Sequence, residues 1–229
     1  MDIDDSQFTD KDSKRPEYRT LYERAPDFVT AYSAHTDLRI GTDGPEAAIG
    51  GLWDEQGPAQ LQFWVDRGLG PHARFLDFGC GTGRFARQVV KFLAAGCYTG
   101  VDISQAALEH CEKLAVREGW VERRPWFVRG SGGVPNIVRD ETFDRVWAFS
   151  VFTHLPPELI SAVLADLAVM EFGEFCFTYK RRPEPLRTGL KQFGYPPEFF
   201  AALAVPLGLQ AEELTDHWPG GQHTMRVWR

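Results

Sequence analysis

The stretch that most constrains the fold runs from Arg74 to Ala86, where an apolar strand leads through a glycine turn toward a helix. The strand is carried by Phe75, Leu76 and Phe78, and the turn by Gly79, Gly81 and Gly83. Glycine tolerates positive φ and has no Cβ, so a ligand can approach the backbone closely. A helix beginning near Gly83 or Arg84 would direct free amide groups at such a ligand. We therefore expect a nucleotide-like ligand above this turn.

The rest of the chain alternates predicted strands with predicted helices. The expected strands are 75–78, 97–101, 126–128, 143–150, 175–179, 209–214 and 224–228. Ser104 is expected to cap one intervening helix, and the pair Pro156 and Pro157 to begin another. This alternation predicts an α/β fold with a doubly wound, mainly parallel seven-stranded sheet and an antiparallel last strand.

The first 70 residues follow a different pattern. Residues 1–15 are polar and charged, which predicts a disordered or loosely attached tail. Aromatic residues recur at roughly helical spacing through 16–44, and another apolar helix is expected to end near Gly68 or Gly70. We therefore expect a tail and N-terminal helical cap over 1–70 and the sheet domain over 71–229.

Composition excludes several classes of protein. The formal net charge is −7, which argues against general nucleic-acid binding. No apolar run approaches the length of a membrane span, and the N-terminus lacks the apolar region of a secretory signal. The four cysteines form no Cys-x-x-Cys pair, which favours free thiols and a cytoplasmic location. Among the six histidines, no pair has helical metal-ligand spacing supported by an acid, so no metal site is expected.

The spacing of the turn helps to identify its ligand. A dinucleotide fingerprint needs Gly-x-Gly-x-x-Gly, whereas here the glycines alternate with single residues. Asp102 ends the second predicted strand, where a carboxylate can accept hydrogen bonds from both hydroxyls of a ribose. Any ligand that contains adenosine would satisfy this arrangement.

Three motifs together resemble the class I S-adenosylmethionine-dependent methyltransferases. They are Leu76 to Gly83, Gly100 to Ser104, and Phe143 to Val146 with Phe149 to Leu155. The resemblance implies that the glycine turn passes beneath the methionine part of S-adenosylmethionine, whose product form is S-adenosylhomocysteine. It also implies the following cofactor-binding residues: Asp77, Gly79, Cys80, Gly81, Gly83, Asp102, Ile103, Ser131, Phe149 and Ser150. Ser131 stands where many members carry an acidic or small polar residue that meets the adenine.

Three side chains are candidates for acid–base chemistry. His154 follows the fourth predicted strand, on the ligand side of an open sheet, where it is either a general base or a local structural cap. His35 and Tyr32 lie in the segment expected to cover the site, where packing is the alternative role. The basic segment from Lys180 to Lys191 would recognise a carboxylate or phosphate of the acceptor, or else form a solvated loop.

The resemblance implies transfer of a methyl group to an oxygen or nitrogen of a small molecule or modified peptide, in bacterial secondary metabolism. One alternative is a non-catalytic S-adenosylmethionine-binding partner or scaffold. Another is a nicotinamide-dependent oxidoreductase, although the chain offers no Tyr-x-x-x-Lys pair for that chemistry.

Overall fold

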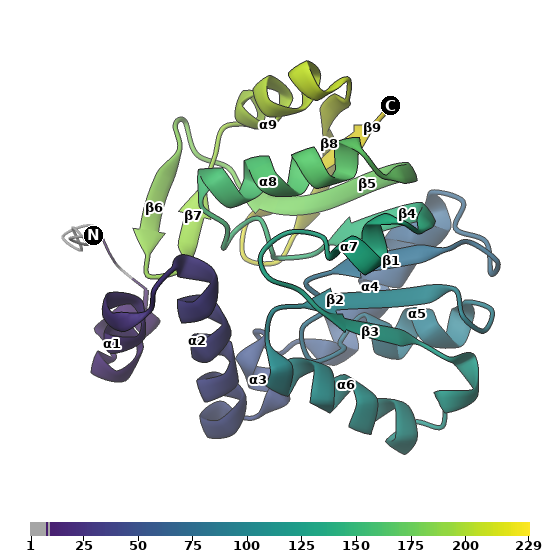
Figure 1. Cartoon of the computed structure of the whole chain (residues 1–229), viewed down its shortest axis with the longest axis horizontal. Coiled ribbons are helices and arrows are strands. Elements are labelled where there is room, and N and C mark those ends of the chain that lie inside the picture. Colours follow the sequence, from purple (N-terminus) through teal and green to yellow (C-terminus); the bar gives the residue numbers. More distant parts are fainter. Residues whose placement is uncertain (1–7, 9) are drawn as a thin grey trace.

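The computed structural model describes Phe8 and residues 10–229. Its main sheet has seven strands in the order β3-β2-β1-β4-β5-β9-β8 (Figure 1). The strands are β1 (Phe75–Phe78), β2 (Tyr98–Asp102), β3 (Trp126–Arg129), β4 (Thr142–Ala148), β5 (Glu171–Lys180), β8 (Gln210–Trp218) and β9 (Gln222–Trp228). β9 runs antiparallel to both of its neighbours, β5 and β8, and the other neighbouring strands are parallel. The predicted fold class is confirmed.

Helices cover both faces of the sheet (Figure 1). One face carries α4 (Trp53–Asp66), α5 (Ala86–Phe92) and α6 (Gln105–Arg117), and the other carries α7 (Asn136–Arg139), α8 (Pro157–Ala168) and α9 (Pro197–Ala204). Short 3-10 helices lie at Asp12–Lys14, Val121–Arg123 and Val205–Leu207. Each parallel crossover therefore returns through a helix packed on the sheet, as a doubly wound fold requires.

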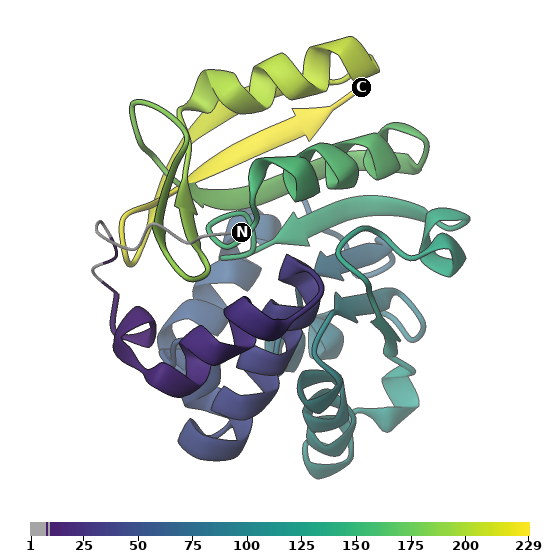
Figure 2. The ribbon, with the colours of Figure 1, turned by 60° about the vertical axis from the view of Figure 1, so that its left-hand side comes forward.

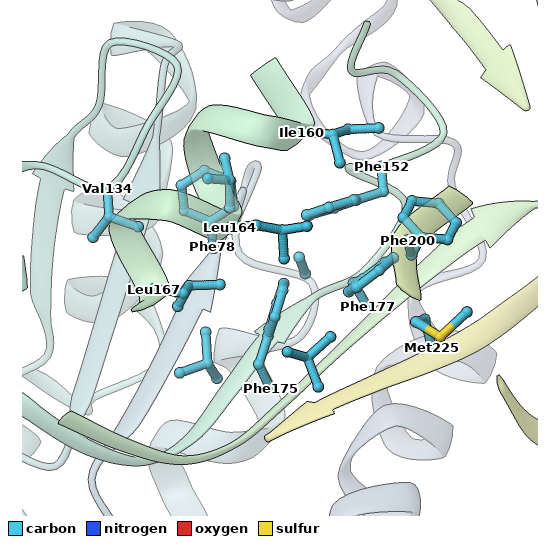
Figure 3. Packing of buried hydrophobic residues seen from close by; sticks show 14 of the residues in the cluster. Phe78, Val134, Phe152, Ile160, Leu164, Leu167, Phe175, Phe177, Phe200 and Met225 are labelled. Carbon is cyan, nitrogen blue, oxygen red and sulfur yellow. The ribbon is translucent and has the colours of Figure 1, made fainter. Parts of the chain in front are cut away.

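Two apolar clusters lie on the two faces of the sheet. Figure 3 shows the larger one, where Leu164 and Leu167 of α8 meet Phe175 and Phe177 of β5. The opposite cluster centres on Trp147, whose indole nitrogen donates to Gln60 Oε1 at 2.9 Å. Because alternate residues of β4 and β5 enter different clusters, both faces of these strands are buried.

The N-terminal helices lie across one end of the sheet. They are α1 (Pro16–Arg24), α2 (Phe28–Asp43) and α3 (Pro45–Ala48). Figures 1 and 2 both place α1 and α2 beside the hairpin formed by β6 (Leu186–Gly189) and β7 (Gln192–Gly194). Phe28 of α2 meets Phe193 of β7 with ring centroids 5.7 Å apart. The hairpin was not expected from the sequence, which indicated a loop through this segment.

Residues 10–15 pack more closely than their polar composition suggests. Ser13 is buried, and its hydroxyl accepts a hydrogen bond from the Leu190 amide at 3.1 Å. Asp12 lies beside α2, where its carboxylate accepts a hydrogen bond from His35 Nε2 at 3.2 Å. Specific polar contacts, and not apolar burial, attach this segment, so a composition-based argument misses it. The rest of the expected tail, residues 1–7 and 9, lies outside the described residues.

Candidate active site

A cavity of about 270 Å³ lies at the carboxyl ends of β1, β2 and β4, beneath α2. The glycine turn forms its floor, and the residues after β4 form one wall. Parallel strands on either side of a change in connection direction leave a crevice at this edge, which is where open α/β sheets bind ligands. The fold therefore places a cavity where the sequence predicts a ligand.

The glycine turn is shaped by close contacts that exclude side chains. The amides of Gly79 and Cys80 both donate to Val101 O, at 2.7 and 3.0 Å. Gly79 has φ +78°, and a Cβ there would lie 2.3 Å from Val151 Cγ2. Both the backbone conformation and the neighbouring side chain thus require glycine at this position.

Asp102 joins the turn to the next helix. Its Oδ2 accepts from the Gly81 amide and its Oδ1 from the Ser104 amide, both at 2.8 Å. Burial raises the pKa of Asp102, and these amide hydrogen bonds oppose that effect. Ser104 caps α6 as predicted, because its hydroxyl accepts from the Ala107 amide at 3.0 Å. The carboxylate is fixed in place and borders the cavity.

Asp77 is a buried carboxyl group on the cavity floor. Burial raises its pKa to about 7, although the Tyr98 hydroxyl donates to Asp77 Oδ2 at 2.7 Å and favours the charged form. Arg84 lines the same region, and its guanidinium donates to Gly51 O at 2.9 Å. Burial lowers the pKa of Arg84 to about 10, so it stays charged at neutral pH.

The wall after β4 contains an unusual backbone conformation. Ser150 has φ +62°, which is rare for a residue with a side chain. Its amide donates to Thr178 Oγ1 at 2.7 Å, and its hydroxyl accepts from Gln222 Nε2 at 2.9 Å. These bonds hold Ser150 and the adjacent Phe149 against the cavity.

Tyr32 of α2 and His154 face each other on the far side of the cavity, with ring centroids 5.6 Å apart. His154 Nδ1 lies 2.6 Å from Lys191 O, and since a carbonyl can only accept, Nδ1 carries the proton and Nε2 the lone pair. Burial and then the nearby Lys191 ammonium lower the pKa of His154 to about 3. The imidazole is therefore neutral at neutral pH.

Residues 75–170 match a family model described as a methyltransferase domain. This segment spans β1 to the end of α8 and contains the glycine turn, Asp102 and His154. The chain contains a class I S-adenosylmethionine-dependent methyltransferase domain. S-adenosylmethionine is the cofactor of this family, and the resemblance seen in the sequence is confirmed.

Two relatives, one found by sequence and one by structure, are named as methyltransferases. Sterol 24-C-methyltransferase erg6 from Schizosaccharomyces pombe is 32% identical over 39% of this chain, but the match spans only 23% of that protein. The chain thus spans about a quarter of the length of this curated relative. A structural relative is magnesium protoporphyrin IX methyltransferase from Synechocystis PCC 6803, which was solved with S-adenosylmethionine bound. The two structures align with a TM-score of 0.68 at 15% identity, over 90% of this chain and 99% of that chain.

A further structural relative has another activity in its name. The [4+2]-cyclase SpnF has a TM-score of 0.56 at 23% identity, covering 70% of this chain and 61% of that chain. At these identities the likeness establishes the fold alone. The reaction must therefore be argued from this chain's own residues.

Most of the predicted cofactor-binding residues line the cavity of the methyltransferase domain: Asp77, Gly79, Cys80, Gly81, Asp102, Ile103, Phe149 and Ser150. Two lie elsewhere. Gly83 has φ +96°, and a Cβ there would lie 3.0 Å from Leu114 of α6, so this glycine allows close helix packing. Ser131 is exposed, whereas its glycine neighbours 130, 132 and 133 line the cavity.

The three candidate catalytic residues also differ in whether they line the cavity. Tyr32 and His154 border the cavity, but His35 does not. The His35 ring is fully buried and stacks on Tyr18 with centroids 4.0 Å apart, and its Nε2 donates to Asp12. His35 therefore holds the N-terminal segment against α2 through its contacts with Asp12 and Tyr18.

Several cavity residues were not identified from the sequence. Gln60 of α4 lines the cavity, and so do Asp12 and Arg39 from the N-terminal region. Of the basic segment from Lys180 to Lys191, only Lys191 lines the cavity. An acidic residue in a polar tail and a cation in a helix carry no local signal for such a role, because tertiary packing alone brings them together.

Within residue 8 and residues 10–229, no helix combines the length and apolarity needed to cross a membrane. In the same part of the chain, no cluster of three or more His, Cys, Asp or Glu side chains has the arrangement of a metal site.

Proposed function

We propose that this chain binds S-adenosylmethionine and transfers its methyl group to an oxygen or nitrogen of a small molecule or modified peptide. The observation that carries this proposal is Asp102, fixed at the end of β2 beside a glycine turn that leaves the backbone open to a ligand. A ribose would bind Asp102, and the methionine part would lie over the turn between Asp77 and Phe149. The residues present fit the cofactor, because the glycine turn, Asp102 and Phe149 all line one cavity.

The chemistry of methyl transfer suits this cavity. S-adenosylmethionine supplies an electrophilic methyl group on a sulfonium, and attack on that group must be in line. Alignment and a preorganised site can therefore provide much of the rate acceleration. Phe149 supplies an aromatic wall that favours a cation near it. The part of the cavity that Tyr32 and His154 border is then the site of the acceptor.

His154 is suited to orienting the acceptor. Its Nε2 lone pair can accept a hydrogen bond from a hydroxyl or amine that approaches the methyl group. With a pKa of about 3, the imidazole is a weak base, which favours positioning of the nucleophile over removal of its proton before the reaction. Tyr32 keeps its proton at neutral pH, since burial raises its pKa, and so acts as a donor.

Other features extend the proposal. We propose that the acceptor carries a carboxylate or phosphate near the segment from Lys180 to Lys191, of which Lys191 alone lines the cavity. All four cysteines are free, which supports a cytoplasmic location. The division near residue 70, the role of the N-terminal helices as a cap, and a place in bacterial secondary metabolism stay predictions.

Two alternatives need a direct test. SpnF shows that a protein named for another reaction shares this fold, so a partner or scaffold that binds S-adenosylmethionine without transferring methyl groups is one of them. A nicotinamide-dependent oxidoreductase is the other, and the spacing of the glycines opposes it.

Calorimetric titration with S-adenosylhomocysteine tests the proposal. Wild type should bind, and Asp102→Ala should bind about 10- to 100-fold more weakly, because hydrogen bonds to a charged group contribute roughly 1.5–3 kcal/mol. Asp54→Ala, which changes a carboxylate on an exposed helix start, should leave the affinity unchanged. Circular dichroism checks that each variant is folded. Absence of binding by wild type would contradict the proposal.

Turnover separates the enzyme from the scaffold. Incubation with limiting methyl-tritiated S-adenosylmethionine and a small-molecule extract should label an acceptor with wild type, and much more slowly with Asp102→Ala. Cofactor binding without any labelled product would favour the scaffold. Quenching of NADH fluorescence, without a response to S-adenosylhomocysteine, would favour the oxidoreductase.

A further inference from the structure

A cluster of opposite charges lies in the acceptor half of the cavity. Three cationic or hydrogen-donating side chains converge on Asp12 Oδ2: His35 Nε2 at 3.2 Å, Arg39 NH1 at 3.6 Å and Lys191 Nζ at 3.7 Å. They come from α2 and from the β6–β7 connection, which are separated in sequence. Asp12, Arg39 and Lys191 all line the cavity. The fold has thus assembled a site for a carboxylate, and a carboxylate of the chain occupies it.

Lys191 is the most constrained member of this cluster. Only 6% of the residue is exposed, although burying an ammonium group is costly unless it is paired. Burial lowers its pKa to about 8, and the Asp12 carboxylate opposes that effect, so the amine is mostly charged at neutral pH. Its Nζ lies 5.3 Å from the centroid of the Tyr32 ring. The charge is therefore held beside the residue pair that borders the acceptor.

Asp12 is the anion of this cluster, and it comes from a short element. It lies in a 3-10 helix of three residues near the start of the described chain. The adjacent Ser13 fixes this segment, because its amide donates to Asp10 Oδ1 and its hydroxyl accepts from the Leu190 amide. Arg39, in contrast, has further partners in Asp43 and Ala47 O, so it keeps its place without Asp12. An anion that enters the cavity can thus compete with the Asp12 carboxylate for Arg39 and Lys191.

We propose that Lys191 and Arg39 bind a carboxylate of the methyl acceptor, and that this carboxylate takes the place of Asp12. The proposal rests on the proposed function, because it assigns the acceptor half of the same cavity. A carboxylate is favoured over a phosphate, since a carboxylate is what the site already holds. Phe28 and Tyr32 line the adjacent wall, which suits an acceptor with a planar apolar body. The bound carboxylate is a recognition group, and a separate hydroxyl or amine faces His154.

Small aromatic probes test this subsite. Benzoate, phenyl phosphate and the neutral benzamide are each titrated by calorimetry into protein saturated with S-adenosylhomocysteine. Benzoate should bind at least tenfold more tightly than benzamide and more tightly than phenyl phosphate. Equal binding of benzoate and benzamide would overturn the proposal, and tighter binding of phenyl phosphate would overturn the choice of a carboxylate.

Variants locate the effect. Lys191→Met should weaken benzoate binding at least tenfold and leave S-adenosylhomocysteine binding unchanged, while Lys191→Arg should retain most of the benzoate affinity. Arg181→Met is the matched control, because Arg181 belongs to the same basic segment but pairs with Glu213 outside the cavity. It should leave both affinities unchanged. Loss of S-adenosylhomocysteine binding in Lys191→Met, with benzoate binding intact, would assign the ammonium to the cofactor and overturn the proposal.

Asp12→Asn tests the exchange of carboxylates and does not depend on the folding of a Lys191 variant. It removes the internal anion but keeps the shape of the side chain, so benzoate affinity should rise about tenfold. Unchanged or weaker benzoate binding would overturn the exchange. If wild type fails to bind S-adenosylhomocysteine, the proposed function alone is contradicted, and the same benzoate and benzamide titrations are read on the ligand-free protein.

Discussion

At the scale of single residues, Asp77 links proton binding to ligand binding. Its pKa of about 7 means that the carboxyl is half protonated at neutral pH. The proposed cofactor carries an ammonium group, which would pair with the ionised form only. Affinity for S-adenosylhomocysteine should therefore be constant above about pH 8 and fall, by up to about tenfold per pH unit, as the pH drops below 7. Calorimetry between about pH 5.5 and pH 8.5, a range that brackets the Asp77 pKa of about 7, measures this dependence.

The same residue affects stability with the opposite dependence on pH. Because the folded-state pKa lies above the ordinary value of 3.8, Asp77 favours folding below that value, and this contribution is lost as the pH rises through about 7. Asp77→Asn should thus raise the free energy of unfolding of the ligand-free protein at about pH 8, by roughly 1–3 kcal/mol, while weakening ligand binding. Urea unfolding checks it. A lower stability at that pH would contradict the assigned shift.

At the scale of elements, α2 is attached to the methyltransferase domain by polar contacts above the cavity. Ser33 Oγ donates to Ile103 O at 2.9 Å, and Asp37 Oδ1 accepts from Ser104 Oγ at 2.5 Å and from the Ala106 amide at 3.3 Å. Asp37 also places a negative charge at the N-terminus of α6, where the helix dipole favours it. These contacts hold α2 over the end of β2.

Removal of Asp37 should loosen this attachment. Asp37→Ala loses two hydrogen bonds and a favourable charge, so we expect a stability loss of about 1–2 kcal/mol and weaker binding of S-adenosylhomocysteine. Urea unfolding and calorimetry measure the two effects. Thr42→Ala on the same helix is the control, since Thr42 is exposed and bonds only within its own helix region. Equal behaviour of the two variants would mean that Asp37 does not hold α2 in place.

The elements also show which parts of the fold are visible in the sequence. The strand, turn and cap around Asp102 were predicted because each has a local signal: an apolar run, glycines that need positive φ, and a serine at a helix start. The β6–β7 hairpin was missed because its strands are short and polar, and its pairing contains an irregularity between Arg187 and Gly189. Local propensity is weak for such an element, and tertiary contacts with α2 stabilise it.

The two halves of the cavity also differ in how many of their residues the sequence identifies. The half above the glycine turn is lined by residues of three local sequence motifs, so its members could be named in advance. The other half depends on Asp12, Arg39 and Lys191, which only the packing of α2 against the hairpin brings together. Ser131 shows the reverse case: the family resemblance implied a contact with the adenine, whereas this residue is exposed and its glycine neighbours line the cavity.

At the scale of the whole molecule, the cavity joins parts of the chain that are far apart in sequence. The turn after β1 forms its floor, α2 its cover and the β6–β7 connection its far side. A ligand bound in the cavity stabilises the elements that enclose it, because it binds only the state in which they are in place. S-adenosylhomocysteine should therefore slow amide hydrogen exchange in Phe28–Asp43 as well as in the turn from Gly79 to Gly83.

Hydrogen exchange followed by mass spectrometry, with and without S-adenosylhomocysteine, measures this coupling. The strand β3 lies at the edge of the sheet and serves as an internal reference, since no residue of Trp126–Arg129 lines the cavity. Protection confined to the turn and Asp102 would mean that α2 does not close on the cofactor. Protection that also reaches α2 would mean that cofactor binding organises the acceptor half, so that Tyr32 stands opposite His154 before the acceptor arrives.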